Sequence, residues 1–202
     1  MKVRIMGLGL ILIACAIGIG ILFWRQELKY QLPTPIPANY VAVNVSTSVS
    51  LPSDLKTGNA LFLHFYSPDC PCSRFNARHL KSLIRSYQDS VKIVVVVSSE
   101  ENKIKAREEL GANLDIWIDT NEKLAKSSGV YSTPQAVIID KNGKLFYRGN
   151  YNRSRYCTTR ATNFAELSLI ALLNNKPPPA FGLLSTQSYG CELSANSDIE
   201  LF

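Results

Sequence analysis

The first apolar run of the chain extends from Ile5 to Trp24 and contains no charged residue. A run of about 20 apolar residues is long enough to cross the hydrocarbon core of a membrane, and Trp24 stands where an aromatic residue meets the membrane interface. We therefore predict one transmembrane helix, with residues 1–25 as an uncleaved anchor and residues 5–24 in the membrane. A signal segment removed by cleavage is one alternative. A lipoprotein whose lipidated residue is Cys15 is another.

Charges beside the apolar run predict its orientation. Lys2 and Arg4 precede it, whereas Arg25 and Lys29 follow it. Together with the free amino group, the first pair favours a cytoplasmic N-terminus and an exported remainder. The four cysteines beyond the run suit an oxidising compartment. We therefore predict a single-pass protein of the bacterial inner membrane with its soluble domain in the periplasm.

Beyond the anchor, proline-rich segments separate the chain into parts. Residues 26–54 contain Pro33, Pro35 and Pro37, and this spacing favours an extended linker. We predict a linker and N-terminal extension over 26–54, a folded domain over 55–175, and a cysteine-containing C-terminal tail over 176–202. The β-branched residues of the extension also predict a short strand at 40–45.

Within 55–175, apolar patterns typical of strands alternate with patterns typical of helices. Strands are predicted at 60–66, 91–97, 114–118, 135–140 and 144–148. Helices are predicted at 73–87, 101–110, 121–127 and 161–173. The turn Asp140-Lys141-Asn142-Gly143 joins the last two strands as a hairpin. This order predicts an α/β domain with a mixed central sheet flanked by helices.

Candidate chemistry gathers where the first strand meets the first helix. The run Asp69-Cys70-Pro71-Cys72-Ser73 places two cysteines at the N-terminus of that helix. Partial positive charge and unpaired N–H groups at a helix N-terminus stabilise a thiolate over a thiol. We therefore predict redox chemistry at Cys70.

Three segments together resemble the thioredoxin superfamily. These are Phe65-Tyr66-Ser67-Pro68-Asp69-Cys70 before the first helix, Gly129-Val130-Tyr131-Ser132-Thr133-Pro134 before a strand, and Ile138-Ile139-Asp140-Lys141-Asn142-Gly143-Lys144 at the hairpin. The last is similar to membrane-anchored TlpA-like members. The chain also resembles an uncharacterised bacterial group with a Cys-Pro-Cys site and two further cysteines near the C-terminus. The resemblance implies a thioredoxin-like fold over about 55–175.

The resemblance also implies roles for individual residues. Cys70 takes the attacking position, and Pro134 takes the place of the family's cis-proline beside it. The backbone of Thr133 would pair with an extended substrate. His64 stands where thioredoxins often carry a buried aspartate that helps to move protons, although a histidine satisfied inside the strand explains it equally well. Asp69 replaces the usual tryptophan, and its carboxylate would raise the pKa of the neighbouring thiol.

The thiol that resolves a mixed disulfide on Cys70 is left open by the spacing, because only Pro71 separates Cys70 from Cys72. Cys72 itself, a monothiol-like site with Ser73, and a distant thiol at Cys157 or Cys191 are the alternatives. We prefer a Cys70–Cys72 pair that cycles, with Cys157–Cys191 as a structural disulfide that ties down the tail. Two inert disulfides are the structural alternative.

Two classes of function follow. The preferred one is a thiol–disulfide oxidoreductase without a cofactor, with Cys70 as nucleophile, whose partners are protein thiols or disulfides and a membrane or periplasmic redox protein. The alternative is a binding module that holds copper or zinc on Cys70 and Cys72 with His64 or His79; we place His79 at the surface. A peroxide-reducing role ranks third. Nucleic acid is an unexpected partner, because the net charge of +6 falls to +3 beyond residue 25 and no basic run occurs.

Overall fold

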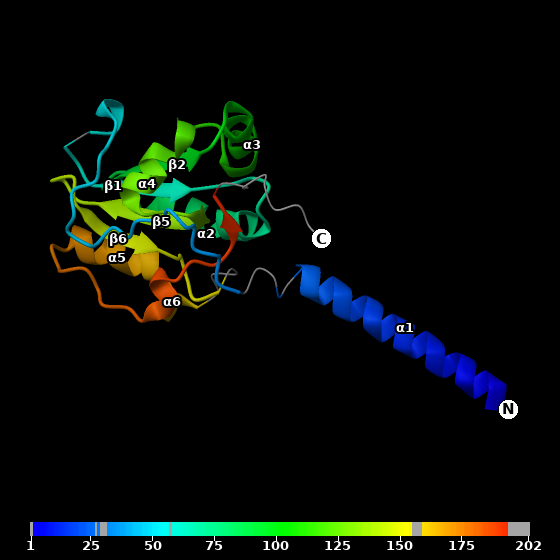
Figure 1. The fold of residues 1–202 in the computed structure, drawn as a ribbon. Helices are drawn as coiled ribbons and strands as arrows, with labels where there is room; N and C mark the ends of the chain where they lie inside the picture. The colour runs from blue at the N-terminus through cyan, green and yellow to red at the C-terminus, as the bar shows by residue number, and fades with distance from the viewer. Residues whose placement is uncertain (1, 27, 29–31, 57, 155–158, 194–202) are drawn as a thin grey trace. The chain divides into compact units, whose positions relative to one another are not determined.

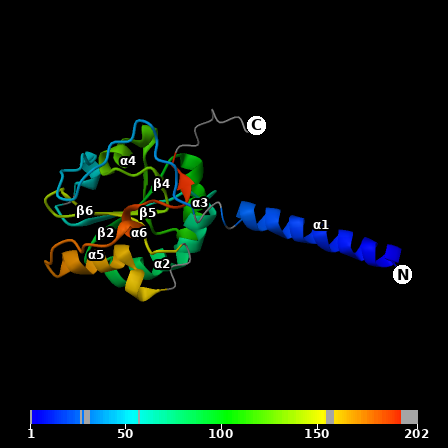
Figure 2. The same cartoon turned by 60° about the horizontal axis from the view of Figure 1, so that its bottom comes forward.

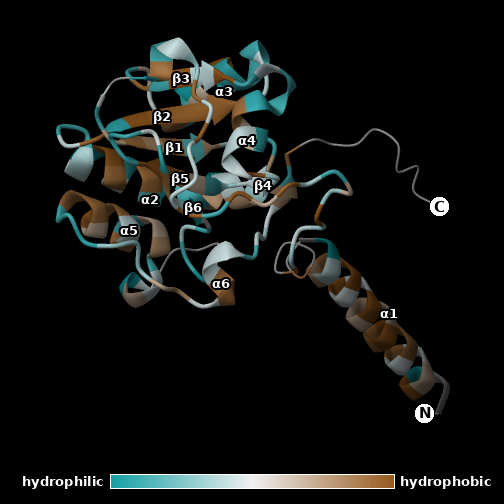
Figure 3. Cartoon of the chain, turned by 60° about the vertical axis from the view of Figure 1, so that its left-hand side comes forward, coloured by the Kyte–Doolittle hydropathy of each residue, from teal (hydrophilic) through white to brown (hydrophobic). Residues whose placement is uncertain are grey.

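The computed structural model describes residues 2–26, 28, 32–56, 58–154 and 159–193 (Figure 1). The chain forms two compact units, Met1–Leu32 and Pro33–Phe202. The first contains helix α1 (Lys2–Gln26), whose 22-residue stretch Arg4–Arg25 reaches a mean hydropathy of 2.7 over an 18-residue window. Figure 3 shows apolar residues along most of this helix. By length and composition, α1 is a candidate membrane span, as the apolar run predicts.

The second unit is built from short strands and helices. Its strands are β1 (Leu61–Phe65), β2 (Lys92–Val97), β3 (Asp115–Ile118), β4 (Ser132–Thr133), β5 (Gln135–Ile139), β6 (Leu145–Gly149) and β7 (Cys191–Glu192). Its α-helices are α2 (Pro71–Tyr87), α3 (Glu100–Leu110), α4 (Lys123–Ser128), α5 (Phe164–Leu173) and α6 (Leu183–Thr186). Single 3₁₀ turns lie at η2 (Ser53–Leu55), η3 (Thr120–Glu122) and η4 (Arg160–Thr162).

Five strands form the central sheet in the order β3-β2-β1-β5-β6. β1 pairs in parallel with β2, and β2 with β3, whereas β5 runs antiparallel to both β1 and β6. Helices α2 and α3 make the crossovers between the parallel strands, and a tight turn joins β5 to β6, because only antiparallel neighbours can be joined so closely. The predicted mixed α/β sheet flanked by helices is confirmed.

Alternation along β1 separates the core into two layers. Phe62 and Tyr66 contact the helices α2, α3 and α5, whereas Leu61, Leu63 and Phe65 contact α4 and the N-terminal extension. Figure 2 shows α4 on one side of the sheet and α2 with α5 on the other. Every residue of β1 is buried, as expected for a central strand covered on both faces. The cysteine loop therefore follows directly from a strand that is packed on both faces.

The extension and the tail pack on the domain. The backbone N–H groups of Ser46 and Val49 donate to the carbonyls of Leu145 and Gly143 across the β5–β6 hairpin. The strand predicted at 40–45 is absent: these residues have no partner in either sheet. β-branched composition alone does not make a strand without an edge to pair with.

The tail is held by hydrogen bonds before it reaches β7. Asn150 donates through its side-chain amide to the carbonyls of Leu184 (2.9 Å) and Gln187 (2.6 Å). Thr34 donates its backbone N–H to the carbonyl of Ser188 at 2.8 Å. The Ser188 side chain is fully buried and its hydroxyl accepts from the side-chain amide of Gln135. The tail is thus fixed to the domain as far as Ser188.

Candidate functional site

Cys70 is the N-cap residue of α2, and Pro71 occupies the first helical position. Proline suits that position because its fixed φ fits a helix and its missing N–H is not needed there. The loop before Cys70 is closed by a hydrogen bond from the Cys70 N–H to the Ser67 carbonyl at 3.1 Å. The Ser73 hydroxyl accepts from the Ser67 N–H at 3.4 Å. Ser73 therefore serves the loop that positions Cys70.

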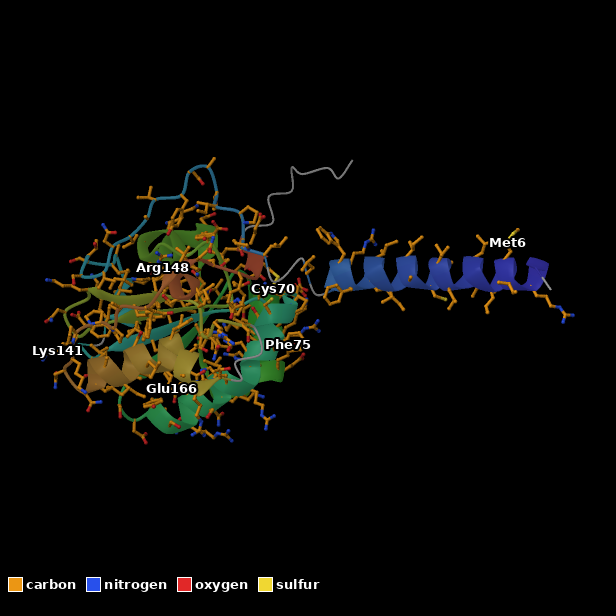
Figure 4. The ribbon with its side chains drawn as sticks, turned by 90° about the horizontal axis from the view of Figure 1, so that it is seen from below. Met6, Cys70, Phe75, Lys141, Arg148 and Glu166 are labelled. Carbon is orange, nitrogen blue, oxygen red and sulfur yellow. A yellow bond between two sulfur atoms is a disulfide. The ribbon has the colours of Figure 1, made fainter. Side chains whose placement is uncertain are left out.

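Cys70 forms a disulfide with Cys191, and the two Cα atoms are 5.9 Å apart. This pairing differs from the preferred Cys70–Cys72 and Cys157–Cys191 pairs and matches the alternative of a distant thiol. Cys157 lies outside the described residues. The sequence could not reveal the pairing because 121 residues separate the two cysteines, and their proximity depends on the path of the tail across the folded domain. Figure 4 labels Cys70 close to β7.

Cys72 does not take part in this disulfide. It lies in the first turn of α2 and is fully buried. Cys70 is also buried in the disulfide, whereas Cys191 is half-buried. Burial therefore leaves Cys191 as the more accessible of the two candidate partners of Cys70.

Strand β4 lies beside the disulfide. The peptide bond between Thr133 and Pro134 is cis, as the resemblance implies, and the Cys70 sulfur lies 3.5 Å from the Thr133 carbonyl oxygen. β4 pairs antiparallel with β7, which places Thr133 opposite Cys191 and Ser132 opposite Glu192. The Leu193 N–H extends this pairing by donating to the Tyr131 carbonyl at 3.1 Å. The tail thus adds a strand to β4 at the redox centre.

A groove bordered by Thr133, the residue opposite Cys191, is lined in part by the tail. Leu193 lines it together with residues from the ends of β1 and β2 and from the loops around them, among them Phe65, Tyr66, Val96, Asp119 and Thr133. Apolar side chains share its walls with Ser67, Ser98 and the carboxylates of Asp119 and Glu122. Burial raises the pKa of the Asp119 carboxyl group, and hydrogen bonds from the Leu124 and Ala125 N–H groups act in the opposite direction.

His64 points to the layer that contains α2 and is fully buried. Its Nδ1 is 2.7 Å from the hydroxyl of Tyr151, and the rings of His64 and His79 both meet that of Tyr151 edge-on. Burial, with a smaller contribution from the neighbouring His79, lowers the pKa of His64 to about 3. His64 is therefore neutral near pH 7 and holds no proton to donate as an imidazolium. This favours the structural alternative over proton transfer.

His79 is half-buried against Tyr151 rather than at the surface. The prediction was wrong because the helix turns this side chain toward the loop after β6, which no local pattern reveals. Burial lowers the pKa of His79 as well, and Glu166 acts in the opposite direction.

Asp69 is exposed, and its carboxylate lies 3.3 Å from the Lys105 ammonium of α3. Lys105 also contacts Glu101 at 2.9 Å, so it partly balances both carboxylates. The effect of Asp69 on the neighbouring thiol is therefore weaker than the sequence alone suggested, because solvent and Lys105 both screen its charge.

The geometry of the described residues gives little support to the alternative of a copper- or zinc-binding module. Within the described ranges, no group of three or more His, Cys, Asp or Glu side chains comes together. Cys70 is joined to Cys191, and Cys72 lies in the core, so the two proposed ligands face different surroundings.

Some residues of the site were not anticipated from the sequence. Tyr151 contacts both histidines, Leu193 lines the groove, and Gly190 brings the tail close to β4. A Cβ atom on Gly190 would lie 2.2 Å from the Thr133 carbonyl oxygen, and its φ is +128°. The only signal in the sequence was a glycine directly before a cysteine, which is too common to indicate a site.

A central mixed sheet, a cysteine at the N-cap of the first crossover helix and a cis-proline beside it define a thioredoxin-like protein. Within this class, the chain belongs to the family described as Domain of unknown function (DUF6436), whose model matches residues 41–193. The thioredoxin-like resemblance is therefore confirmed, and the relatives below support its TlpA/ResA-like branch.

Among curated proteins, the chain is similar to Thiol-disulfide oxidoreductase ResA of Bacillus anthracis, with 25% identity over 127 residues, covering 61% of this chain and 72% of that protein. ResA of Geobacillus thermodenitrificans is 32% identical over 92 residues, covering 44% of this chain and 52% of that protein.

Two solved structures share the fold. An uncharacterized conserved protein from Geobacillus kaustophilus has a TM-score of 0.62 and 24% identity, covering 79% of this chain and 97% of that one. A hypothetical protein from Sinorhizobium meliloti 1021 has a TM-score of 0.61 and 19% identity, covering 76% and 96%.

Proposed function

We propose that this protein is a thiol–disulfide oxidoreductase that acts on the cysteines of other proteins, anchored by α1 with its domain in the periplasm. Cys70 is the nucleophile, and Cys70–Cys191 is the disulfide that turns over. The observation that carries the proposal is the position of Cys70: it caps α2, lies beside the cis-proline and is bonded to a cysteine of a short strand. The similarity to proteins named Thiol-disulfide oxidoreductase ResA supports the same reaction.

The surroundings of Cys70 favour its reactivity. When the disulfide is reduced, the thiolate at the N-cap of α2 faces the positive end of a helix of 17 residues. The only acidic neighbour along the chain, Asp69, is paired with Lys105. The Cys70 thiolate is therefore the better nucleophile of the pair.

The exchange has two steps. A substrate thiolate attacks the Cys70 sulfur, the Cys70–Cys191 bond breaks, and Cys191 leaves as a thiolate that takes a proton from solvent. A second substrate thiolate then attacks the substrate sulfur of the mixed disulfide, which forms the substrate disulfide and releases the Cys70 thiolate. Two electrons pass from the substrate to the protein, and the reverse sequence reduces a substrate. A redox partner at the membrane or in the periplasm restores the starting state.

The test is a redox titration of the full chain in detergent, equilibrated in dithiothreitol buffers and quenched with an alkylating reagent. Mass spectrometry should show a reversible change of two thiols, mapped to Cys70 and Cys191. Both Cys70→Ser and Cys191→Ser should abolish it, whereas Cys15→Ser in the apolar helix is the matched control and should leave it unchanged.

Two results would contradict the proposal in different ways. A thiol count that stays constant over the whole range of buffers would mean that the disulfide is structural. A two-thiol change that survives Cys191→Ser but not Cys72→Ser would return the resolving role to Cys72.

A further inference from the structure

The segment from Gly190 to Leu193 meets β4 as a separate peptide would. It is extended, its cysteine is bonded to the nucleophile, and its backbone pairs antiparallel with Ser132 and Thr133. The last backbone bond of this pairing joins the Leu193 N–H to the Tyr131 carbonyl. An extended peptide that adds a strand to an exposed edge gains affinity from the backbone and specificity from the side chains.

We propose that this segment is an internal substrate: it occupies the place that a substrate protein takes during exchange, and its sequence reports which substrates fit. The inference rests on the proposed function and adds the class of substrate. The substrate presents an extended segment with a small residue, ideally glycine, directly before its cysteine and an apolar residue two positions after it.

The requirement before the cysteine follows from Gly190. The chain passes so close to β4 there that a Cβ atom would lie 2.2 Å from the Thr133 carbonyl oxygen. Backbone cannot yield as the end of a flexible side chain can, and a φ of +128° also favours glycine. A bulky residue at this position separates the two strands and weakens their pairing.

The positions after the cysteine differ in their demands. Glu192 is exposed, so the residue directly after the cysteine is free to vary. Leu193 packs against the apolar cluster that contains Phe65 and Val96, so an apolar residue belongs two positions after the cysteine. An acidic residue there would lose water and face the carboxylates of Asp119 and Glu122, which line the same groove.

In this proposal, the substrate and β7 compete for the same edge of β4. The substrate strand and β7 cannot pair with β4 at the same time, so the tail must leave the edge when the substrate binds. When Cys191 attacks the Cys70 sulfur of a mixed disulfide, the Cys70–substrate bond breaks, the Cys70–Cys191 bond forms, and the substrate leaves as a thiolate. Its strand is displaced from β4 in the same event.

The test uses the full chain with Cys191→Ser and the synthetic peptide Ser-Tyr-Gly-Cys-Glu-Leu, whose cysteine carries a thionitrobenzoate leaving group. The Cys70 thiolate attacks the peptide sulfur and releases coloured thionitrobenzoate, and mass spectrometry locates the adduct. Replacing the peptide glycine by valine should slow capture about tenfold, because backbone pairing is lost. Replacing its leucine by aspartate should also slow capture, whereas replacing its glutamate by alanine is the control and should not.

A second arm tests the competition. In the Cys191→Ser chain, a further Gly190→Ala change should speed peptide capture several-fold, because its own tail no longer holds the edge. Gly182→Ala, in the same tail with open space around it, is the matched control and should have no effect.

Different results would overturn this inference and the proposed function. Adducts that form at equal rates with all peptides, and a Gly190→Ala change without effect, would overturn this inference and leave the proposed function standing. No adduct at Cys70 with any peptide would argue against the proposed function itself.

Discussion

His64 shows how burial alone can set the role of a residue. Its side chain has 0% relative exposure, and its hydrogen bond goes to Tyr151 rather than to a cysteine. Since burial disfavours the charged form, the pKa of the imidazole falls to about 3 from its ordinary value of 6.5. We therefore propose that His64 positions Tyr151 in the layer beneath the site and stays neutral during exchange.

This shift predicts how stability depends on pH. Between about pH 6.5 and 3 the unfolded chain binds a proton at His64 that the folded chain does not, so the free energy of unfolding falls as the pH falls. The contribution of this residue is on the order of 1 kcal/mol per pH unit in that range. Urea unfolding of the full chain in detergent, followed by Trp117 fluorescence, should therefore show a shallower pH dependence for His64→Gln than for the parent. An unchanged slope would contradict the buried, neutral state.

At this scale, the sequence predicted Cys70 as the nucleophile, which stays a prediction, but it did not reveal the cysteine to which Cys70 is bonded. Cys70 follows from local information, because a cysteine after a buried strand and before a proline marks the start of a helix. Cys191 required the path of the whole tail, and Gly190 required the distance to a carbonyl in another strand. Neither is encoded in the spacing of neighbouring residues.

Among the elements, α4 depends on a single carboxylate for its position. This helix has six residues, too few to be stable alone. Asp119, directly after β3, accepts hydrogen bonds from the Leu124 N–H at 2.9 Å and the Ala125 N–H at 2.8 Å. Leu124 and Ala125 are in turn buried against the sheet. Asp119 therefore joins a strand end to the layer that covers it.

Replacing this carboxylate should destabilise the domain without removing the redox centre. We expect Asp119→Ala to lower the free energy of unfolding by about 2 kcal/mol, because two backbone donors lose a buried acceptor. Asp140→Ala is a control with similar chemistry in an exposed turn, where water replaces the lost acceptor. Equal losses for the two variants in urea unfolding would mean that the α4 contacts contribute little.

The elements themselves were well predicted wherever apolar positions repeat. The predicted strands at 60–66 and 91–97 correspond to β1 and β2, and the predicted helix at 73–87 corresponds to α2. The miss at 40–45 and the unpredicted β7 have a common cause. Short segments form or fail to form strands according to the edge that is available, and this is a property of the tertiary fold.

For the whole molecule, the proposed orientation fixes which side of the membrane holds the reactive thiols. Lys141, in the turn between β5 and β6, is exposed, whereas Leu145 of the same hairpin is buried. With the domain outside, Lys141→Cys should react with a membrane-impermeant maleimide in intact spheroplasts as fully as after lysis. Leu145→Cys is the control and should react in neither case. Labelling of Lys141→Cys only after lysis would reverse the orientation.

The attachment of Ser188 to Thr34 limits how far the reactive arm can travel. If Ser188 stays buried during exchange, three residues span the distance to Cys191, which allows a reach of about 10 Å from that fixed point. A thiol tethered this closely acts at an effective concentration of millimolar or more. A released Cys191 therefore outcompetes dilute free thiols, so a bound substrate has a short lifetime. In the proposed exchange, the length of this three-residue tether, rather than the thiol concentration of the cell, therefore determines how rarely a free thiol reacts with the mixed disulfide.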